Sequence, residues 1–381
     1  MFAISASVSG TASVAVTYPA PVVGHNTASS VSGWGGGGIV YNNGIIYSAQ
    51  NSASAPVAMT SYSNGVAGSS MSNLNAIPAL TNAAAGGLIM GPDGNLWGTE
   101  QNATKAFKMN PSTGVAIEIG ISCPSGSQGG SGTAVLGPQT GIVSGGGNVY
   151  VLCADEAGHG GTNNAVNTIN PSTDAVTTCT MGSGGGTPAG AFADGAIYSG
   201  GNIYTEDTIG GGSRPGGASS GVWVSIPASN CGNFTEFKPG GSYTLGVGNL
   251  QLMSDGNLYS EGDNYLASTS FGGATAASPA FNLSDGGGGL VQDTVLGSKW
   301  FFGDSGGSDL IINTAWSGGT QYLIDGAHHA NFVPLNAGGS AMSAGQCEES
   351  FSAGGGNGMI QLPDGKLAWA AQSNWICFAN I

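Results

Sequence analysis

The stretch Asp93-Gly-Asn-Leu-Trp97 recurs as Asp255-Gly-Asn-Leu-Tyr259, and each copy is a tight turn followed by a short strand with an aromatic residue. Five looser copies keep the order of turn, apolar residue and aromatic residue: Asn43–Tyr47, Gly147–Tyr150, Gly201–Tyr204, Gly297–Phe301 and Asp364–Trp369. The aromatic positions of successive copies lie 42 to 68 residues apart. Self-similarity at such a spacing is the signature of repeat architectures, so we predict seven similar units.

Each unit is predicted to contain four antiparallel strands. In the second unit these are a strand at Leu88–Met90, the aromatic strand, a strand at Lys105–Met109 and an alternating strand at Val115–Ile121 with Ile117, Ile119 and Ile121 on one face. The turn before the last strand, Asn110-Pro-Ser-Thr-Gly114, recurs as Asn170-Pro-Ser-Thr-Asp174. Four such strands form one propeller blade, so we predict an all-β, seven-bladed β-propeller of four-stranded antiparallel blades. An open array or a sandwich of similar hairpins is the alternative.

The two ends of the chain complement each other in this interpretation. The seventh unit ends after a third strand, Trp375–Asn380, and the N-terminal stretch Ser13–Tyr18 alternates apolar and small residues. We therefore expect the N-terminal strand to close the last blade and protect its edge. Residues 13–381 form one propeller domain with an insertion loop at 325–358, and residues 1–12 form an apolar N-terminal extension.

Glycine and charge restrict the class of protein. Glycine accounts for 71 of 381 residues, and glycine runs such as Gly35–Gly38 precede predicted innermost strands, where they permit close backbone approach. Only 7% of residues are charged, with 6 Lys or Arg against 21 Asp or Glu and a net charge of −15. This balance excludes a nucleic-acid partner, and no apolar run is long enough to predict a membrane span.

The chain contains six cysteines, an even number, and no pair has the spacing of a metal or redox motif: Cys123, Cys153, Cys179, Cys231, Cys347 and Cys377. An even number of cysteines with few charges favours disulfides and a location outside the cytoplasm, and buried free thiols are the alternative. Met1–Gly10 contains no Lys or Arg, so no signal peptide is predicted. The expected location is extracellular, on the cell surface or on a virus particle.

Gly91-Pro-Asp-Gly-Asn-Leu-Trp-Gly-Thr-Glu100 resembles the blade signature of the virginiamycin B lyase (streptogramin lyase) family, and Val16-Thr-Tyr-Pro-Ala-Pro21 resembles the closing outer strand of that family. The resemblance implies a seven-bladed propeller. In that family a magnesium ion, a histidine and a glutamate near the central axis open streptogramin rings. The histidine lies in a Pro-His-x-Ile stretch, which this sequence lacks, so no catalytic residue is carried over and fold likeness alone does not imply the activity.

Acidic residues end the second strand in five predicted blades: Glu100, Asp155 with Glu156, Glu206, Glu261 and Asp304. They predict an acidic rim on the face that carries the long loops. One interpretation is a calcium or magnesium site with Glu100, Glu206, Glu261 and Asp304 as candidate ligands, because hard cations take several oxygens. The other is a set of solvated loop ends that keep a weakly charged surface soluble. No cofactor is required by either interpretation of the fold.

All four histidines are predicted on the same long-loop face: His25, His159, His328 and His329. His328-His329 shares the 325–358 insertion with Cys347, Glu348 and Glu349. This group is either a metal or acid–base cluster, or a polar loop packed over the last blade and tied by a Cys347–Cys377 disulfide.

Two functions agree with these observations. The first is a non-catalytic propeller that recognises a surface glycan or protein, or assembles with its own copies, through the long-loop face. The second is a metal-assisted lyase or lactone hydrolase of the streptogramin-lyase type, for which the family resemblance and the acidic rim are the motivation.

Overall fold

The computed structural model shows an almost entirely β-stranded chain, with one short 3-10 helix, η2 (Cys231–Asn233), among the described residues. The structure describes residues 38–50, 52–64, 66–67, 72–100, 103–123, 141–153, 165–181, 191–208, 222–237, 250–252, 257–262, 265–270, 290–291, 300–303, 310–313, 321–324, 332–334, 359–364, 367–371 and 375–379. The predicted N-terminal extension, residues 1–12, and the predicted closing strand, Ser13–Tyr18, lie outside these residues. The prediction of an all-β chain is confirmed.

The described strands form seven antiparallel sheets, numbered here in chain order. Sheet 1 contains β1 (Ile39–Asn42), β2 (Ile45–Ala49), β3 (Val57–Ser63), β4 (Val66–Ala67) and β5 (Ser72–Leu74), and sheet 2 contains β6 (Ala84–Met90), β7 (Leu96–Glu100), β8 (Lys105–Met109) and β9 (Ala116–Gly120). Sheet 3 contains β10 (Ile142–Gly145), β11 (Asn148–Cys153), β12 (Ala165–Ile169) and β13 (Val176–Thr180). Sheet 4 contains β14 (Ala191–Ser199), β15 (Asn202–Thr208), β16 (Val222–Pro227) and β17 (Thr235–Phe237).

Sheet 5 contains β18 (Leu250–Leu252), β19 (Asn257–Gly262) and β20 (Tyr265–Ser270). Sheet 6 contains β21 (Leu290–Val291), β22 (Trp300–Gly303), β23 (Leu310–Asn313), β24 (Gln321–Ile324) and β25 (Phe332–Pro334). Sheet 7 contains β26 (Met359–Gln361), β27 (Leu367–Ala371) and β28 (Trp375–Ala379).

Strand β25 lies inside the stretch 325–358, which the sequence predicts as an insertion loop. Phe332 pairs with Ile324 of β24, so part of that stretch extends sheet 6. Its three residues, with a proline at the end, are too short a run to show a strand pattern in the sequence.

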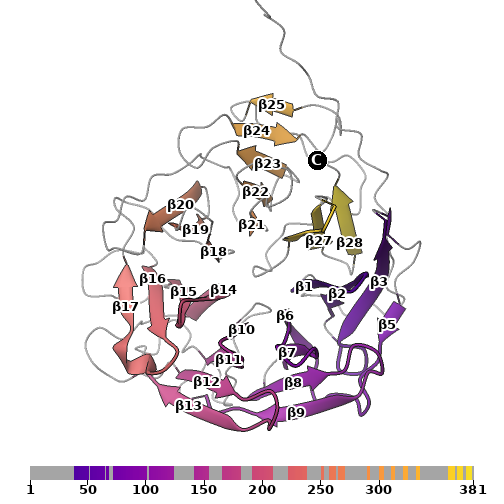
Figure 1. Ribbon diagram of the computed structural model, residues 1–381, viewed down its shortest axis with the longest axis vertical. Helices are drawn as coiled ribbons and strands as arrows, with labels where there is room; N and C mark the ends of the chain where they lie inside the picture. Colours follow the sequence, from indigo (N-terminus) through magenta and orange to yellow (C-terminus); the bar gives the residue numbers. More distant parts are fainter. Residues whose placement is uncertain are drawn as a thin grey trace, which may run out of the picture.

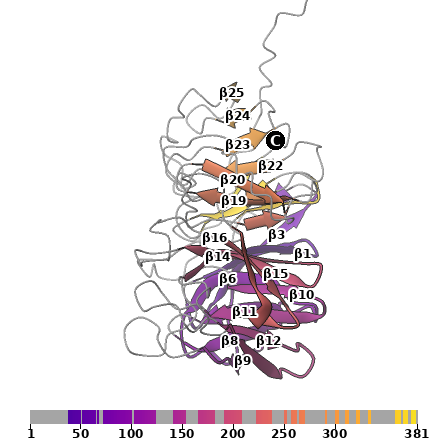
Figure 2. The same ribbon diagram turned by 90° about the vertical axis from the view of Figure 1, so that its left-hand side faces the viewer.

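The sheets are arranged around a common centre, and the colours of Figure 1 follow them round from indigo to yellow. The first strand of each sheet contacts the first strand of the next, from β1 through β6, β10, β14, β18 and β21 to β26, and β26 contacts β1. Figure 2 shows the ring from the side, with the sheets of β6 and β10 next to each other. This arrangement is that of a β-propeller.

A close backbone approach near the centre explains one of the glycine runs. A Cβ on Gly38 would lie 2.4 Å from the backbone nitrogen of Leu88, so no larger residue fits where sheet 1 meets β6. The predicted role of glycine before an innermost strand is confirmed at this position.

The Asp-Gly turn between β6 and β7 is organised by the Asp93 carboxylate. Its Oδ1 accepts hydrogen bonds from Trp97 Nε1 at 2.9 Å and from the Asn95 backbone at 3.2 Å, and Oδ2 accepts from Asn95 Nδ2 at 2.8 Å. Gly94 has a φ of +76°, and a Cβ on Gly91 would lie 2.3 Å from Trp97 Nε1. Gly91 and Asp93 are therefore explained by the buried position of Trp97, which is fully inaccessible to solvent, and Gly94 is explained by its left-handed backbone angle.

The two Asn-Pro-Ser-Thr turns have the same geometry but differ at the fifth residue. Both fifth residues have left-handed backbone angles, with φ of 73° at Gly114 and 58° at Asp174. A Cβ on Gly114 would lie 2.2 Å from the Asn75 carbonyl oxygen, so glycine is required there. Asp174 instead accepts a hydrogen bond from Lys108 of sheet 2, which also bonds the Pro171 carbonyl at 3.1 Å. Asp174 thus links sheets 2 and 3 from a left-handed backbone position that glycine would adopt with less strain.

The core lies between neighbouring sheets. The aromatic residues of the repeat are buried in it: Tyr47, Trp97, Tyr150 and Tyr204. Separate clusters join sheets 1 and 2, sheets 2 and 3, and sheets 3 and 4. Of the three isoleucines predicted to share a face of the last strand of the second unit, Ile119 and Ile121 are buried, whereas Ile117 is exposed. The outer strand of sheet 2 is therefore only partly covered.

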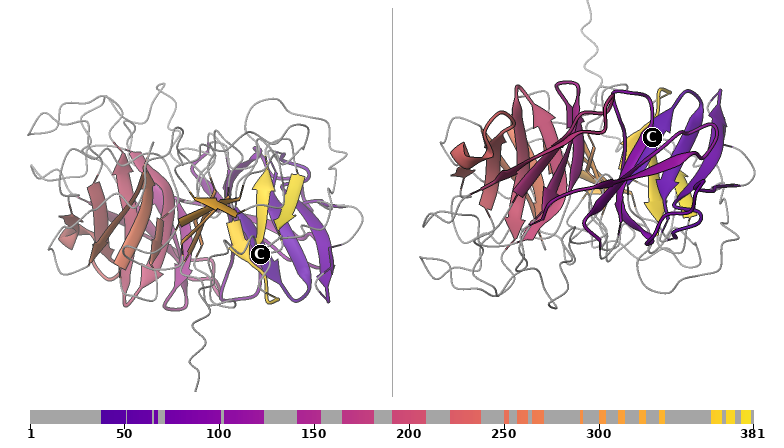
Figure 3. Two further views of the ribbon diagram at one scale, coloured as in Figure 1. Left: turned by 90° about the horizontal axis from the view of Figure 1, so that it is seen from above. Right: turned by 90° about the horizontal axis from the view of Figure 1, so that it is seen from below.

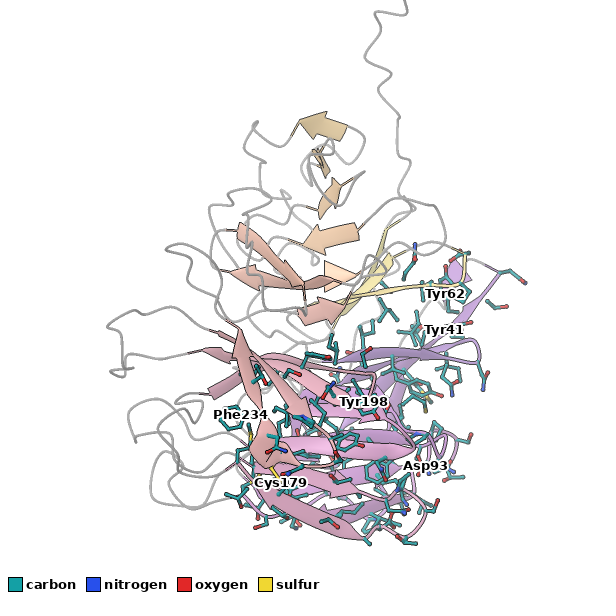
Figure 4. The ribbon with its side chains drawn as sticks, turned by 60° about the vertical axis from the view of Figure 1, so that its left-hand side comes forward. Tyr41, Tyr62, Asp93, Cys179, Tyr198 and Phe234 are labelled. Atoms are coloured by element: carbon teal, nitrogen blue, oxygen red, sulfur yellow. A yellow bond between two sulfur atoms is a disulfide. The ribbon has the colours of Figure 1, made fainter. Side chains whose placement is uncertain are left out.

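The first and last sheets meet in a fourth cluster. Ile39, Ile46 and Tyr62 of sheet 1 pack with Leu362 and Ala368 of sheet 7. At the edge of the cluster the Tyr62 hydroxyl lies 2.8 Å from both carboxylate oxygens of Asp364, 302 residues further along the chain. Tyr41 meets Tyr62 edge to face, and both are labelled in Figure 4.

Two disulfides join consecutive sheets. Cys123, which follows β9, bonds Cys153 at the end of β11, and Cys179 of β13 bonds Cys231 in η2. The second bond lies beside Phe234, which packs against the core between sheets 3 and 4 (Figure 4). The predicted partner of Cys377, Cys347, lies outside the described residues.

Replacement of Tyr62 by phenylalanine removes the hydrogen bond between the first and last sheets and keeps the ring in the core. We expect the free energy of unfolding to fall by about 1 to 2 kcal/mol, because the bond is to a charged acceptor. Urea unfolding followed by tryptophan fluorescence measures the change. Tyr41→Phe in the same cluster is the matched control, and equal losses for the two variants would contradict the role of the Asp364 contact.

Peptide mapping of the unreduced protein by mass spectrometry is expected to find Cys123–Cys153 and Cys179–Cys231. Since these bonds use four of the six cysteines, we expect Cys347–Cys377 as the third bond. A free thiol at either remaining cysteine, or a dimer that a reductant separates, would refute this last pairing.

Candidate functional site

The strands run between two faces of the ring (Figure 3). The turns that join the first to the second strand and the third to the fourth strand of sheets 2 and 3 lie on one face, which we call the turn face. The second strands β7 and β11 end on the opposite face, which also carries the connections between consecutive sheets and which we call the loop face. This follows from the antiparallel order of the strands.

Glu100 is the last residue of β7 and lies at the loop face, and its side chain is completely buried. Its Oε2 accepts hydrogen bonds from the Asn82 backbone at 3.1 Å and from Asn82 Nδ2 at 3.3 Å. Its Oε1 is buried and has no hydrogen-bond partner among the described residues. Burial raises the pKa of Glu100 although the Asn82 bonds oppose the shift. Unpartnered buried polar atoms are rare, so this one requires an explanation.

A compact polar cluster lies next to Glu100. Lys105 Nζ is 2.5 Å from Glu118 Oε2 and 2.8 Å from Thr81 Oγ1, and Thr81 donates to Glu118 from both its backbone and its hydroxyl group. Partial burial raises the pKa of Glu118, but the bonds from Lys105 and Thr81 outweigh it and lower that pKa to about 2. The cluster therefore fixes residues 81–82, the segment that presents Asn82 to Glu100.

A second polar contact holds the loop face of sheet 3. Asn167 is fully buried, and its Oδ1 accepts from the Ser122 backbone at 3.1 Å while its Nδ2 donates to the Ser122 carbonyl at 3.0 Å. Because Cys123 follows directly and is bonded to Cys153, both residues that lead into the stretches 124–140 and 154–164 are fixed.

The backbone places two of the three predicted glutamates at equivalent positions. Glu206 and Glu261 are each the second residue after the aromatic residue of their strands, β15 and β19, whereas Glu100 is the third residue after Trp97 in β7. Because successive residues of a strand alternate between its two faces, Glu100 lies on the other face of its strand. The side chains of Glu206 and Glu261 lie outside the described part of the structure. Seven other predicted site residues lie entirely outside the described ranges: Asp155, Glu156, Asp304, His25, His159, His328 and His329. Within the described part of the chain no three His, Cys, Asp or Glu side chains form a group that could hold a metal ion.

Sequence reasoning identified Glu100 but missed Asn82, Lys105, Glu118 and Asn167. Because lysine is rare in this chain, the presence of Lys105 in one predicted strand and Glu118 in the next could have indicated this ion pair. Asn82 and Asn167 gave none, because asparagine is common throughout the sequence and their partners lie 18 and 45 residues away.

Comparison with solved structures identifies the fold. A streptogramin B lyase structure aligns with a TM-score of 0.57 over 92% of this chain and 95% of its own, at 14% sequence identity. Virginiamycin B lyase from Staphylococcus aureus aligns with a TM-score of 0.52 over 91% of this chain and 95% of its own, also at 14% identity. The chain has the lyase-like β-propeller fold.

A third similar structure comes from a different kind of protein. The extracellular domain of a B. thetaiotaomicron protein classed as a one-component system aligns with a TM-score of 0.58, at 12% identity, over 96% of this chain and 40% of its own. No protein-family model matches the sequence, and no curated protein matches it significantly. At these identities the lyase-like propeller is shared as a fold, and the activity of the neighbours is not transferred. Among the described residues no helix has the length and apolar character to cross a membrane.

The low pKa of Glu118 predicts that part of the stability of the folded protein is lost at acidic pH. Its pKa in the folded state, about 2, lies below the ordinary value of 4.5, so its contribution is present above pH 4.5 and is lost as the pH falls toward 2. We expect Glu118→Gln to be less stable than the parent protein at pH 7 and the difference to shrink as the pH falls through this window. Thermal melts of both proteins from pH 7 to pH 2.5 measure the difference, and a constant difference would contradict the ionised Lys105–Glu118 contact.

Proposed function

We propose that the chain is a non-catalytic β-propeller of seven blades that works outside the cell or on a particle surface. It recognises a glycan or a protein, or assembles with its own copies, through the loop face. Each of the seven sheets is one blade in this proposal, and Ser13–Tyr18 supplies the outer strand of the last. The cyclic contacts of the innermost strands, from β1 round to β26 and back, support the seven-blade ring.

The observation that carries the proposal is the Cys123–Cys153 disulfide at the loop face. It joins the residues that lead into two long stretches, 124–140 and 154–164, and the Asn167 contacts to Ser122 hold the same corner. Disulfides persist in oxidising environments, which supports a place outside the cytoplasm. Loops held at rigid bases are where binding residues concentrate.

The similar solved structures support the same proposal. The domain from B. thetaiotaomicron is extracellular, so the lyase-like propeller occurs in proteins that act at a cell surface. The polar composition of this chain also supports the proposal, because Ser, Thr and Asn side chains offer hydrogen bonds without charge, which suits uncharged glycans and subunit contacts.

Binding by purified protein on glycan arrays and in cross-linking pull-downs tests the proposal. A variant with Asp155→Asn, Glu156→Gln and His159→Ala, in the stretch 154–164 that follows Cys153, is expected to lose at least tenfold in affinity for the partner found. Ser172→Ala, in an exposed turn on the turn face, is the matched control and should bind normally. Equal binding by the two variants would place recognition elsewhere, and absence of any partner together with turnover of a lactone would refute a non-catalytic role.

The second candidate function is a metal-assisted lyase or lactone hydrolase. The buried Glu100, with one unbonded oxygen and a raised pKa, favours this function, since groups with perturbed pKa values are common in active sites. Among the described side chains, Glu100 is the residue that would offer oxygen to the magnesium ion implied by the family, an ion that polarises a substrate carbonyl when bound. Turnover of cyclic depsipeptides by the parent protein, Glu100→Gln and Glu261→Gln tests this function. Absence of turnover in the parent eliminates it, and turnover that both variants retain in full removes these two glutamates from the mechanism.

A further inference from the structure

The two disulfides differ in how solvent and hydrogen-bond donors reach their sulfur atoms. In each bond one cysteine is buried, Cys153 at 1% and Cys231 at 2% exposure, and its partner is only partly buried. The partly buried residues, Cys123 and Cys179, are the more accessible to a dissolved thiol. In thiol–disulfide exchange the attacked sulfur joins the incoming thiol and the other sulfur leaves as a thiolate. The expected leaving group is therefore the sulfur of Cys153 in one bond and of Cys231 in the other.

A hydrogen-bond donor faces the Cys153 sulfur. Asn167 Nδ2 lies 3.2 Å from Cys153 Sγ and 3.0 Å from the Ser122 carbonyl oxygen, so its two hydrogens have two acceptors. The orientation of this amide is fixed, because its Oδ1 accepts from the Ser122 backbone N–H at 3.1 Å and from the Thr178 hydroxyl at 2.7 Å, and a backbone N–H can only donate. Asn167 is fully buried, so bulk water does not compete for the donor.

Such a donor affects the closed and the broken disulfide unequally. A disulfide sulfur is a weak acceptor, whereas a thiolate is charged and accepts a much stronger hydrogen bond. Burial in apolar surroundings disfavours a thiolate and so makes a buried sulfur a poor leaving group. Asn167 Nδ2 opposes this penalty at Cys153 when the bond breaks. The Ser122 carbonyl oxygen, 3.8 Å from Cys153 Sγ, can accept the S–H once the thiolate has taken up a proton.

The second disulfide has the opposite arrangement. The Cys231 backbone N–H donates to Cys179 Sγ at 3.2 Å, so the donor lies on the more accessible sulfur. Within the described part of the chain no donor lies on Cys231 Sγ, the sulfur that would leave. The two bonds thus combine similar burial with different stabilisation of the leaving group, and Cys179–Cys231 provides an internal comparison.

We propose that Cys123–Cys153 is a thiol-exchange site that takes up low-molecular-weight thiols at Cys123. The thiolate of the incoming molecule attacks Cys123 Sγ and forms a mixed disulfide, and the electron pair of the broken bond leaves with Cys153 Sγ, which then takes a proton from water. The exchange conserves the number of sulfur–sulfur bonds, so it needs no oxidant. A second molecule of the thiol can release Cys123 as a thiol and leave as the disulfide of the small molecule. The proposal does not depend on whether the loop face recognises a partner.

Brief treatment of the native protein with glutathione, quenched with acid and followed by peptide mass spectrometry, tests the site. We expect the mixed disulfide on Cys123, and opening of Cys123–Cys153 about tenfold faster than that of Cys179–Cys231. Glutathione on Cys153 instead, or opening of Cys123–Cys153 no faster than that of the other bond, would overturn the proposal.

The role of the amide is tested by Asn167→Leu, which removes the donor with little change in volume. We expect the opening of Cys123–Cys153 to slow about tenfold relative to Cys179–Cys231 in the same sample, a ratio that corrects for a general loss of stability. Thr178→Val removes a different hydrogen bond of the same amide and is the matched control, with the ratio of the parent. Equal ratios for the two variants would refute stabilisation of the leaving sulfur by Asn167. If Asn167→Leu does not fold, the position of the mixed disulfide and the ratio in the parent protein decide the question.

Discussion

Sheets 1, 2 and 3 each have two apolar faces, and neighbouring sheets cover both of them. The buried residues accordingly form clusters between sheets, and Trp97 of sheet 2 packs with Ile142 and Val149 of sheet 3. In a row of such sheets, the first and the last would each leave one apolar face exposed unless they pack against each other. The cluster of Ile39 and Leu362 with the Tyr62–Asp364 bond provides that return, so the core depends on a contact between residues about 300 positions apart.

The few polar groups in the described sheets are largely used to join one sheet to another. Lys108 lies 5.4 Å from the Trp97 ring centroid and reaches across to Asp174, and the two disulfides connect sheet 2 to sheet 3 and sheet 3 to sheet 4. Backbone hydrogen bonds cover the start of one outer edge. Ile77 forms an isolated parallel bridge with Val115 next to β9, which pairs the beginning of an edge that could otherwise pair with another chain.

The sequence allowed the scaffold to be predicted better than the site. Asp93, Gly94 and Trp97 act on one another within five residues, so their spacing reveals the turn and the buried strand. The tandem Asn-Pro-Ser-Thr turns were equally local. Asn82 and Glu100, by contrast, belong to different segments, and their contact exists only because Lys105 and Glu118 fix residues 81–82. No periodicity encodes such a contact, and the strand β25 was too short to give one.

The stretch Gly91–Glu100 contains residues that the fold explains and one residue, Glu100, that the fold does not explain. This difference decides what the resemblance of the stretch to the lyases means. Asp93 has every hydrogen bond it needs, and Trp97 is fully buried, so both are explained by the fold alone. Glu100, three residues further on, is not, because one of its oxygens gains nothing from the protein around it. A shared signature therefore transfers the turn and the aromatic strand from one propeller to another. The surroundings of the glutamate at its end depend on segments outside the signature, here Asn82, and can differ between proteins that share the fold.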